Sequence, residues 1–424
     1  MSASGLTLYR LATTALKPAA RWLLDKRARK GKEDPARLHE RRGEARLARP
    51  DGQLIWIHAA SVGESQMALT IAEALLDQHA DAHVLITSGT LTSASLIARR
   101  GMERLIHQFP PVDAPAWVEA FLDHWQPDLA VFTESELWPN LILAAKARGI
   151  PLALMNARMN QASLDNWARW PDSAKSVLGA FDWIGAADQR TAAGLSQLIG
   201  NPVELAGNLK LECGLPAPEP EALAKVRSQI GDRPVYVAAS THAGEEALIA
   251  AAHAEILQSQ PDALMILAPR HPERAEDVAQ VLTMQGLGFA QRSKAEMPAS
   301  KPVWLADTLG EMALWYALCP VAVIAGSFKP GIGGHNPIEA SRAGAVVITG
   351  PHVDSFSDVY EVYDAHKARL VVETSSDIAR SVLSTWRCKS LMLSDALNAL
   401  NALPGGTLPL TLSHLNRLLD QGRP

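Results

Sequence analysis

The chain has 424 residues and a net charge of −5, and hydrophobic and charged residues make up 47% and 20% of it. These values are ordinary for a globular protein of two or three domains that can bury full cores, and they exclude a polyanion-binding surface over the whole molecule, so we expect no nucleic acid partner. Three widely spaced cysteines, at positions 213, 319 and 388, exclude a disulfide framework and fit a reducing compartment.

The first 49 residues stand apart by their charge. Residues 21–49 contain eleven Lys or Arg against five Asp or Glu, and such a cluster attracts anionic surfaces. The apolar stretch Leu6–Leu24 is interrupted by Arg10, Lys17 and Arg21, so it predicts an interfacial amphipathic segment on an anionic membrane surface, not a span. The apolar contacts are expected from Leu6, Tyr9, Leu16, Leu23 and Leu24. A helix that packs on the first domain is the alternative.

From residue 53 onward, short apolar runs alternate with helical patterns, which is typical of βαβ units and parallel sheets. The expected strands of the first half are Leu54–Ala60, His83–Ser88, Leu129–Glu134 and Leu152–Ala157. Those of the second half are Val235–Ser240, Leu264–Pro269, Val321–Ser327 and Ala345–Gly350. The two halves also echo each other in sequence, since AASVGES at 59–65 resembles AASTHAGEE at 238–246.

We therefore predict an α/β protein with two Rossmann-like doubly wound domains that face a central cleft. The domains are expected at 50–212 and 223–424, joined by a proline-rich linker at 213–222 that should resist regular structure. Whether the last helices return to the N-terminal domain is left open. Ligands bind outside the carboxyl ends of parallel strands, so candidate site residues are sought there.

Carboxylates and a lysine follow the expected strands of the first domain. Glu64 lies in the turn after the first strand, where it is placed to act as a general base or, alternatively, as a first-turn helix acid. Glu134 and Glu136 follow the strand at 129, with the same alternative, which suits Glu136 best. Lys210 ends the first domain and is either a partner for an anionic donor or a surface lysine.

The second domain offers groups suited to an anion. Arg270 and His271 follow the strand at 264, and the arginine fork suits phosphate. The glycine-rich loop 326–335 leads into a helix expected to begin near Asn336 or Pro337, where amides favour negative charge and Glu339 can take ribose hydroxyls. The loop fits neither the dinucleotide nor the NTPase fingerprint. D-x-D is absent and the histidines are scattered, so no metal site and no cofactor are predicted.

At these positions the sequence resembles the Kdo (3-deoxy-D-manno-octulosonic acid) transferases, a GT-B-type glycosyltransferase family. The motifs that carry the resemblance are HAASVGE, FTESELWPN, GNLK, AASTHAGEE, APRHPER, LGEM and GSFKPGIGGHNPIEA. They come in the family's order and span roughly residues 54–355. Together they are specific, although each alone is weak. The segment 6–24 departs from the family's common apolar N-terminal anchor, because charged residues interrupt it.

The resemblance implies an inverting transfer of Kdo from CMP-Kdo to a lipid A precursor, lipid IVA, in lipopolysaccharide assembly at the cytoplasmic face of the bacterial inner membrane. It implies that Glu64 is the catalytic base and that Glu134 and Lys210 stabilise the transition state. The implied CMP contacts are Pro269, Arg270, Gly310, Glu311, Met312, Asn336, Pro337, Ile338 and Glu339. The alternatives are another tandem-Rossmann enzyme on UDP-sugars, either a 2-epimerase or a UDP-glycosyltransferase, and a non-catalytic protein that binds lipid surfaces.

Overall fold

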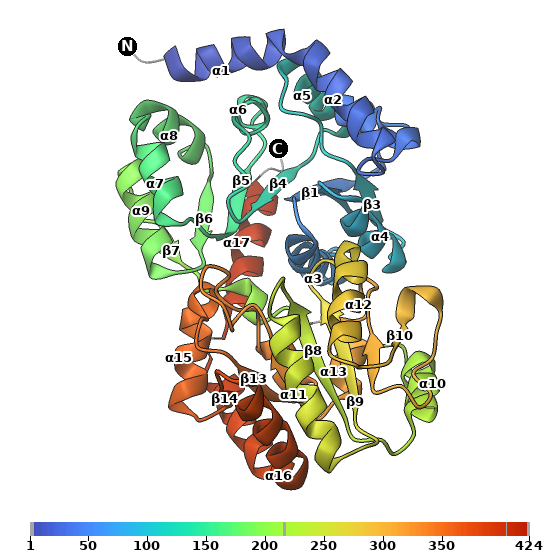
Figure 1. Ribbon diagram of the computed structural model, residues 1–424. Helices are drawn as coiled ribbons and strands as arrows, with labels where there is room; N and C mark the ends of the chain where they lie inside the picture. The colour runs from blue at the N-terminus through green and yellow to red at the C-terminus, as the bar shows by residue number, and fades with distance from the viewer. Residues whose placement is uncertain (1–3, 215–217, 404, 422–424) are drawn as a thin grey trace. The chain divides into compact units, whose positions relative to one another are not determined.

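The computed structural model describes residues 4–214, 218–403 and 405–421. The chain forms two compact units, an N-terminal unit of Met1–Cys213 with Pro404–Pro424 and a C-terminal unit of Gly214–Leu403. Each unit contains a parallel sheet with helices on both of its faces (Figure 1). The prediction of two Rossmann-like doubly wound domains is confirmed.

The sheet of the N-terminal unit has seven strands in the order β3-β2-β1-β4-β5-β6-β7. The order reverses between β1 and β4, and in doubly wound sheets such a switch point opens a crevice at the carboxyl ends of the strands. Each of the four strands expected in this half is present within one residue. The strands are β1 Gln53–Ala59, β2 Ala82–Ser88, β3 Leu105–Gln108, β4 Leu129–Thr133, β5 Leu152–Ala157, β6 Trp183–Ala186 and β7 Glu204–Leu205.

Helices cover both faces of this sheet because its strands are apolar on both sides. Leu54 and Trp56 of β1 face one core, and Ile55 and Ile57 face the other, so the alternate residues of one strand serve two layers. The helices are α3 Val62–Gln78, α4 Leu91–Arg99, α5 Pro115–Trp125, α6 Pro139–Ala147, α7 Gln161–Ala168, α8 Pro171–Leu178 and α9 Gln189–Ile199.

The last helix of the chain, α17 (Thr407–Gln421), belongs to the N-terminal unit. Its leucines 412, 415, 418 and 419 are buried in the same core as α3. The carboxylate of Glu212 accepts hydrogen bonds from the backbone N–H groups of Thr407 (2.6 Å) and Leu408 (3.0 Å), which stabilises the positive end of this helix.

The C-terminal unit repeats the plan with a sheet of seven strands in the order β10-β11-β9-β8-β12-β13-β14, and its switch point lies between β8 and β12. The four strands expected in this half are present. The strands are β8 Val235–Thr241, β9 Leu264–Pro269, β10 Phe289–Gln291, β11 Val303–Leu305, β12 Val321–Ile324, β13 Val346–Thr349 and β14 Arg369–Val371. The helices are α10 Pro220–Ile230, α11 Glu246–Ser259, α12 Ala275–Met284, α13 Met312–Leu318, α14 Ile338–Arg342, α15 Ser357–Ala365 and α16 Ser375–Ala402.

The expectation that the whole stretch 213–222 lacks regular structure is wrong at its end. Helix α10 already begins at Pro220, because proline suits a first helical position, where its missing N–H has no intrahelical partner in any case. Residues 215–217 of this stretch lie outside the described residues.

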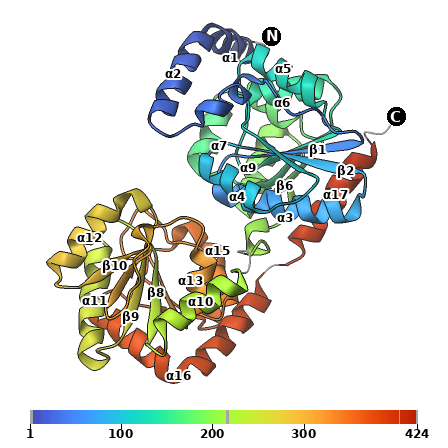
Figure 2. The same cartoon turned by 90° about the vertical axis from the view of Figure 1, so that its right-hand side faces the viewer.

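The N-terminal segment forms two helices, α1 (Ser4–Ala15) and α2 (Lys17–Arg29), and α1 lies beside α5 and α6 (Figure 2). The expected apolar face is partly wrong. Leu24 is buried, Leu6 packs against the domain core, and the Tyr9 hydroxyl donates a hydrogen bond to Asp113 (2.9 Å). The large apolar side chains that are exposed are Leu8, Leu11, Leu16, Trp22 and Leu23. The segment therefore packs with one side on the domain and leaves a second apolar side uncovered.

Candidate functional site

Glu64 lies at the switch point of the N-terminal sheet, where β1 ends and α3 begins. It is only 5% exposed. Its Oε1 accepts from the Ser61 hydroxyl (2.6 Å), and its Oε2 accepts from the Thr133 hydroxyl (2.7 Å) and the Ala60 backbone N–H (3.1 Å). Ser61 in turn caps α3 by accepting from the Glu64 backbone N–H. Glu64 is thus a first-turn acid of α3, and three hydrogen bonds hold its carboxylate in a fixed orientation at the switch point.

Glu134 and Lys210 form an ion pair beside Glu64. Glu134 comes directly after Thr133 at the carboxyl end of β4, and its carboxylate pairs with the Lys210 ammonium. The Lys210 side chain also lies against Gly63, since a Cβ on that glycine would be 3.8 Å from its Nζ. Lys210 is therefore not an isolated surface lysine. The structure brings together the three residues whose catalytic roles the resemblance implies.

Glu136 is a third carboxylate near this group. Helix α6 begins only at Pro139, so the alternative that Glu134 or Glu136 is a first-turn helix acid is wrong. Burial and the neighbouring Glu64 carboxylate raise the pKa of Glu136, while a hydrogen bond from the Trp138 indole (3.0 Å) partly offsets this. The proximity of three carboxylates and one lysine makes this edge of the sheet electrostatically unusual, as functional sites tend to be.

Strained backbone conformations occur at the carboxyl edges of the two sheets. Three non-glycine residues with positive φ directly follow or lie at the carboxyl ends of strands, namely Glu134 (52°) after β4, Asn156 (52°) in β5 and Ser240 (57°) in β8. Left-handed conformations of such residues are costly and persist where surrounding contacts impose them, often at functional sites. Asn156 shows such a contact, because its side-chain oxygen accepts from the Leu209 backbone N–H (2.8 Å) and holds the segment that carries Lys210.

In the C-terminal unit the glycine-rich loop is shaped by the buried Glu245. This carboxylate accepts hydrogen bonds from the backbone N–H groups of Gly326 (2.8 Å), Phe328 (3.0 Å) and His242 (3.0 Å). The motif after β8 therefore fixes the loop after β12 across the switch point. The loop leads to α14, which begins at Ile338 with Pro337 at its N-cap, close to the expected start.

Arg270 and Glu339 lie near one another at the carboxyl edge of the C-terminal sheet. Arg270 follows β9, and its guanidinium acts on the charge of both Glu339 and His335. Burial raises the pKa of Glu339 to about 7, which Asn336 and Arg270 only partly oppose. The Asn336 side chain also accepts from the Ile338 backbone N–H (3.0 Å), so this loop is ordered by its own polar groups.

A pair of histidines at this edge was missed from the sequence. The rings of His242 and His335 stack at 5.1 Å with an interplanar angle of 8°, and their Nε2 atoms are 2.8 Å apart. Burial lowers the pKa of both rings, to about 4 for His335. The residues belong to the AASTHAGEE and GIGGHNPIEA motifs, but their contact requires β8 and β12 to be neighbours, which the sequence does not state.

The resemblance implies that the segment Gly310–Met312 contacts CMP. This segment follows strand β11 and includes Met312, the first residue of α13. The Glu311 carboxylate is already paired with Arg292 (2.7 Å) and the Thr308 hydroxyl. A ligand at this segment would therefore meet the backbone around Gly310, which has no side chain and whose φ of 83° favours glycine. The implied donor contacts thus lie at or beyond the carboxyl ends of β9, β11 and β12 of one sheet. They are Pro269, Arg270, Gly310, Glu311, Met312, Asn336, Pro337, Ile338 and Glu339.

Comparisons with known proteins agree with this arrangement. A family model described as "3-Deoxy-D-manno-octulosonic-acid transferase (kdotransferase)" matches residues 36–213. The 3-deoxy-D-manno-octulosonic acid transferase of Bordetella pertussis is 33% identical over 97% of this chain and 99% of its own length. An Arabidopsis thaliana protein described as "Probable 3-deoxy-D-manno-octulosonic acid transferase, mitochondrial" is 34% identical over 88% of this chain and 85% of its own.

Among solved structures, the UDP-GlcNAc 2-epimerase of Neisseria meningitidis covers 86% of this chain and all of its own, with a TM-score of 0.58 and 14% identity. That likeness shows the shared tandem-Rossmann, GT-B-type fold alone, because the sequences have diverged too far to indicate a shared activity. The sequence relatives are specific, and their identity extends over most of both chains. The chain belongs to the 3-deoxy-D-manno-octulosonic acid transferase family.

Proposed function

We propose that this enzyme transfers Kdo from CMP-Kdo to a lipid A precursor, lipid IVA, with inversion at the anomeric carbon. The observation that carries the proposal is the cluster of Glu64, Glu134 and Lys210 at the switch point of the N-terminal sheet. The N-terminal unit would bind the acceptor and the C-terminal unit the nucleotide-sugar. Family membership favours this function over the UDP-sugar enzymes that share the fold.

In this mechanism Glu64 accepts the proton of the acceptor hydroxyl, while the oxygen of that hydroxyl attacks the anomeric carbon of Kdo. The bond from that carbon to the phosphate oxygen breaks, and CMP leaves with the electron pair. The Ser61 and Thr133 hydroxyls hold the carboxylate in place, so one oxygen can exchange a protein donor for the substrate hydroxyl. The Lys210–Glu134 pair offers fixed charges where the transition state develops charge of its own.

On the donor side, the Arg270 guanidinium suits the phosphate, and the Glu339 carboxylate suits the ribose hydroxyls. The backbone N–H groups of the ordered glycine-rich loop add neutral donors. These groups give the leaving phosphate cationic and hydrogen-bonding partners from the chain itself. That transfer proceeds without a metal ion stays a prediction, checked by assaying the enzyme in EDTA.

A nucleotide-binding measurement separates this function from its UDP-sugar rivals. We expect CMP to raise the melting temperature of the protein and UDP at the same concentration to leave it unchanged, because only a ligand that binds the folded state stabilises it. Differential scanning fluorimetry of the wild type and Arg270→Ala makes the comparison. Stabilisation by UDP but not CMP would assign the protein to the rival class, and stabilisation by neither would favour a non-catalytic role.

The raised pKa of Glu339 predicts how CMP binding depends on pH. If the ionised carboxylate accepts the ribose hydroxyls, affinity increases as pH rises through about 7, by roughly tenfold between about pH 6 and about pH 8. In the free protein, the free energy of unfolding changes in the opposite direction. The raised pKa of Glu339 means that stability falls as pH rises from about 4.5 to about 7, the ordinary and the folded-state values. Titration calorimetry with Glu339→Gln as the control isolates this group from the phosphate of CMP. The proposed contact is wrong if both proteins show the same pH dependence.

We further propose that α1 and α2 hold the enzyme on an anionic membrane surface, at the cytoplasmic face of the inner membrane. Their exposed side chains include the apolar Leu8, Leu11 and Trp22 and the basic Lys26, whose ammonium lies 4.9 Å from the Trp22 ring centre. Apolar and basic groups on one face are typical of interfacial helices. Within the described residues, none of the helices is both long and apolar enough to span a bilayer.

The basic run contributes less to such a surface than its length suggests. Arg37 is paired with Glu40, Arg41 with Glu33, and Arg49 with Asp128, so these three side chains are tied into the domain. A deletion of residues 1–49 would remove these internal contacts along with the exposed face. Point substitutions on α1 and α2 are therefore the sharper test.

Flotation with vesicles that contain anionic lipid checks this attachment. We expect the wild type to float with the vesicles at low salt and to release at high salt, because each exposed basic residue adds about 1 kcal/mol that salt screens. The triple variant Leu8→Ser, Leu11→Ser, Trp22→Ser should stay unbound, whereas Met284→Ser, which removes an exposed apolar side chain on α12, should bind as the wild type does. Equal flotation of all three proteins would contradict the proposed surface.

A further inference from the structure

The side-chain amide of Asn156 links the ion pair of Glu134 and Lys210 to the sheet. Asn156 lies in β5 and is 3% exposed. Its Oδ1 accepts from the backbone N–H of Leu209 (2.8 Å), one residue before Lys210, and its Nδ2 donates to Glu134 Oε1 (3.4 Å). The same Oε1 pairs with the Lys210 ammonium. One buried side chain therefore contacts the carboxylate of the pair and the segment that carries the lysine.

The orientation of this amide is fixed by its partners. A backbone N–H only donates, so the atom that faces Leu209 must be the side-chain oxygen, and the NH₂ group then faces the Glu134 carboxylate. The backbone adds to the constraint, because the Glu134 N–H donates to the Met155 carbonyl (3.1 Å), next to Asn156. The amide is thus suited to hold the carboxylate in one orientation.

The backbone of β5 is distorted at this residue. Asn156 has a φ of 52°, and the pairing of β5 with β6 shifts register between Leu154 and Ala157. Such irregularities re-aim side chains, often beside active sites, and asparagine adopts the left-handed region more readily than most residues. The chain therefore keeps a costly conformation at the point where this amide meets the ion pair.

The far end of the lysine segment is held by α17. Gly207 lies so close to Thr407 that an added Cβ would be 2.5 Å from the Thr407 hydroxyl oxygen. Glu212 accepts from the first backbone N–H groups of the same helix, as described above. These contacts do not involve Asn156. Removal of its side chain should therefore loosen the link to β4 and β5 while the segment stays folded.

We propose that Asn156 is a positioning residue for Kdo transfer, which holds Glu134 and Lys210 in the geometry in which they act on the reacting carbon. The assignment rests on the proposed function for the reaction, and on the contacts of Asn156 for the positioning. Fixed charges stabilise a transition state when they are already in place, and a misplacement of about 1 Å can cost about 100-fold in rate. The alternative is a purely structural amide that satisfies the Leu209 N–H.

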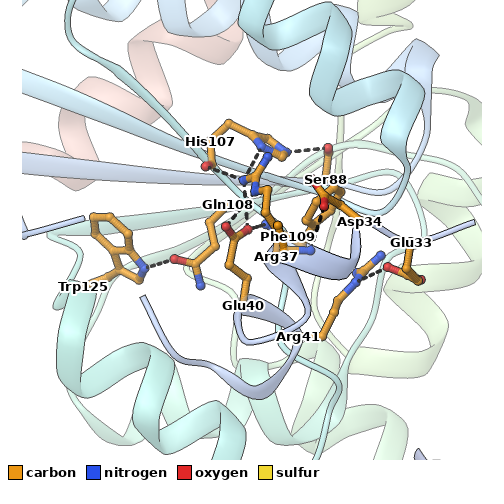
Figure 3. A network of polar contacts seen from close by, with 11 residues as sticks. Glu33, Asp34, Arg37, Glu40, Arg41, Ser88, His107, Gln108, Phe109 and Trp125 are labelled. Carbon is orange, nitrogen blue, oxygen red and sulfur yellow. Dashed lines mark hydrogen bonds and ion pairs between the residues drawn. The ribbon is translucent and has the colours of Figure 1, made fainter. Parts of the chain in front are cut away.

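Asn156→Gly removes both contacts and relieves the positive φ, so this variant should fold. We expect kcat to fall by about 10- to 100-fold while KM for donor and acceptor stays unchanged. Trp125→Phe is the control for stability. It removes a buried hydrogen bond of the same length, from the Trp125 indole to the Gln108 oxygen (2.8 Å), in a separate network of the same unit (Figure 3). It should lower the melting temperature and leave kcat at the wild-type level.

Asn156→Asp distinguishes positioning from structure by its pH dependence. The aspartate keeps an acceptor for the Leu209 N–H but turns its other oxygen toward Glu134, and two close carboxylates raise the pKa of one of them. At low pH the shared proton lets the variant act as asparagine does. As this proton is lost, the carboxylates repel each other and compete for Lys210, so kcat relative to the wild type should fall by about tenfold between about pH 5 and about pH 8. A constant ratio over this range would overturn the proposal.

The reactivity of Lys210 toward acetic anhydride, followed by peptide mass spectrometry, does not depend on turnover. An ion pair favours the protonated ammonium, which does not react, so acetylation of Lys210 should be several-fold faster in Asn156→Gly than in the wild type. Lys146, which pairs with Asp182 outside this network, is the internal reference and should react equally in both proteins.

Equal acetylation of Lys210 in the two proteins, or wild-type kcat in Asn156→Gly, would contradict the positioning role and leave the proposed function intact. If acetylation rises in Asn156→Gly but the wild type transfers no Kdo, the proposed function fails and the contact between Asn156 and the ion pair stands.

Discussion

Glu64→Gln is expected to lower kcat by about 10²- to 10⁴-fold, the usual contribution of a general base. The substitution keeps the local structure, because the amide oxygen can accept from the Ala60 backbone N–H and the amide nitrogen can donate to the Ser61 hydroxyl. CMP binding should be unchanged, since the proposed CMP contacts all lie in the C-terminal unit. Single-turnover rates and CMP calorimetry on the same preparations measure both quantities.

The matched control for this variant is Glu73→Gln. Glu73 lies in the same helix α3 and makes a surface ion pair with Arg100. Exposed pairs contribute little to stability, about 0 to 1 kcal/mol, so turnover should stay at the wild-type level. Wild-type turnover in Glu64→Gln itself would remove Glu64 as the base.

Lys210→Met is expected to lower kcat by about 10²-fold or more, as removal of a charge that stabilises a transition state does. This change also leaves Glu134, which is largely buried, without its partner, and part of the loss could then be structural. The double variant Glu134→Gln, Lys210→Met tests for the structural effect. It removes both charges, so its melting temperature should recover, while its kcat stays low because both charges proposed to act on the transition state are lost.

Lys146→Met is the control for the lysine, because Lys146 forms an ion pair with Asp182 on the surface of the same domain and should be dispensable. Recovery of turnover in the double variant would show that Lys210 acts only by neutralising Glu134. A rise in KM with kcat unchanged in Lys210→Met would assign the lysine to ground-state binding.

The strands could be predicted because buried parallel strands are short apolar runs between turn residues, and this pattern is local. The position of Glu64, Glu134 and Arg270 at strand ends followed from the same pattern. Their mutual contacts did not, because they depend on the order of strands in the sheet. The stacked pair His242 and His335 shows this clearly, since 93 residues separate two rings that touch.

The N-terminal helices illustrate a second limit. Their apolar residues occupy two sides, and the sequence does not state which side the domain covers. Leu24 and Leu6 face the domain, whereas Leu8 and Leu11 do not, although all four are leucines in one amphipathic pattern. Similarly, Arg41 and Arg46 belong to the same basic run, yet only Arg41 has a buried carboxylate, Glu33, within reach. Tertiary partners decide these cases.

Mass spectrometry of the acceptor, after incubation with purified protein and CMP-Kdo, measures the proposed transfer of Kdo to a lipid A precursor with Glu64 as the base. We expect acceptor that is heavier by whole Kdo units, with CMP released in equal amount, and no such product with Glu64→Gln. Unchanged acceptor with the wild type, or equal product from both proteins, would rule out this reaction or this base.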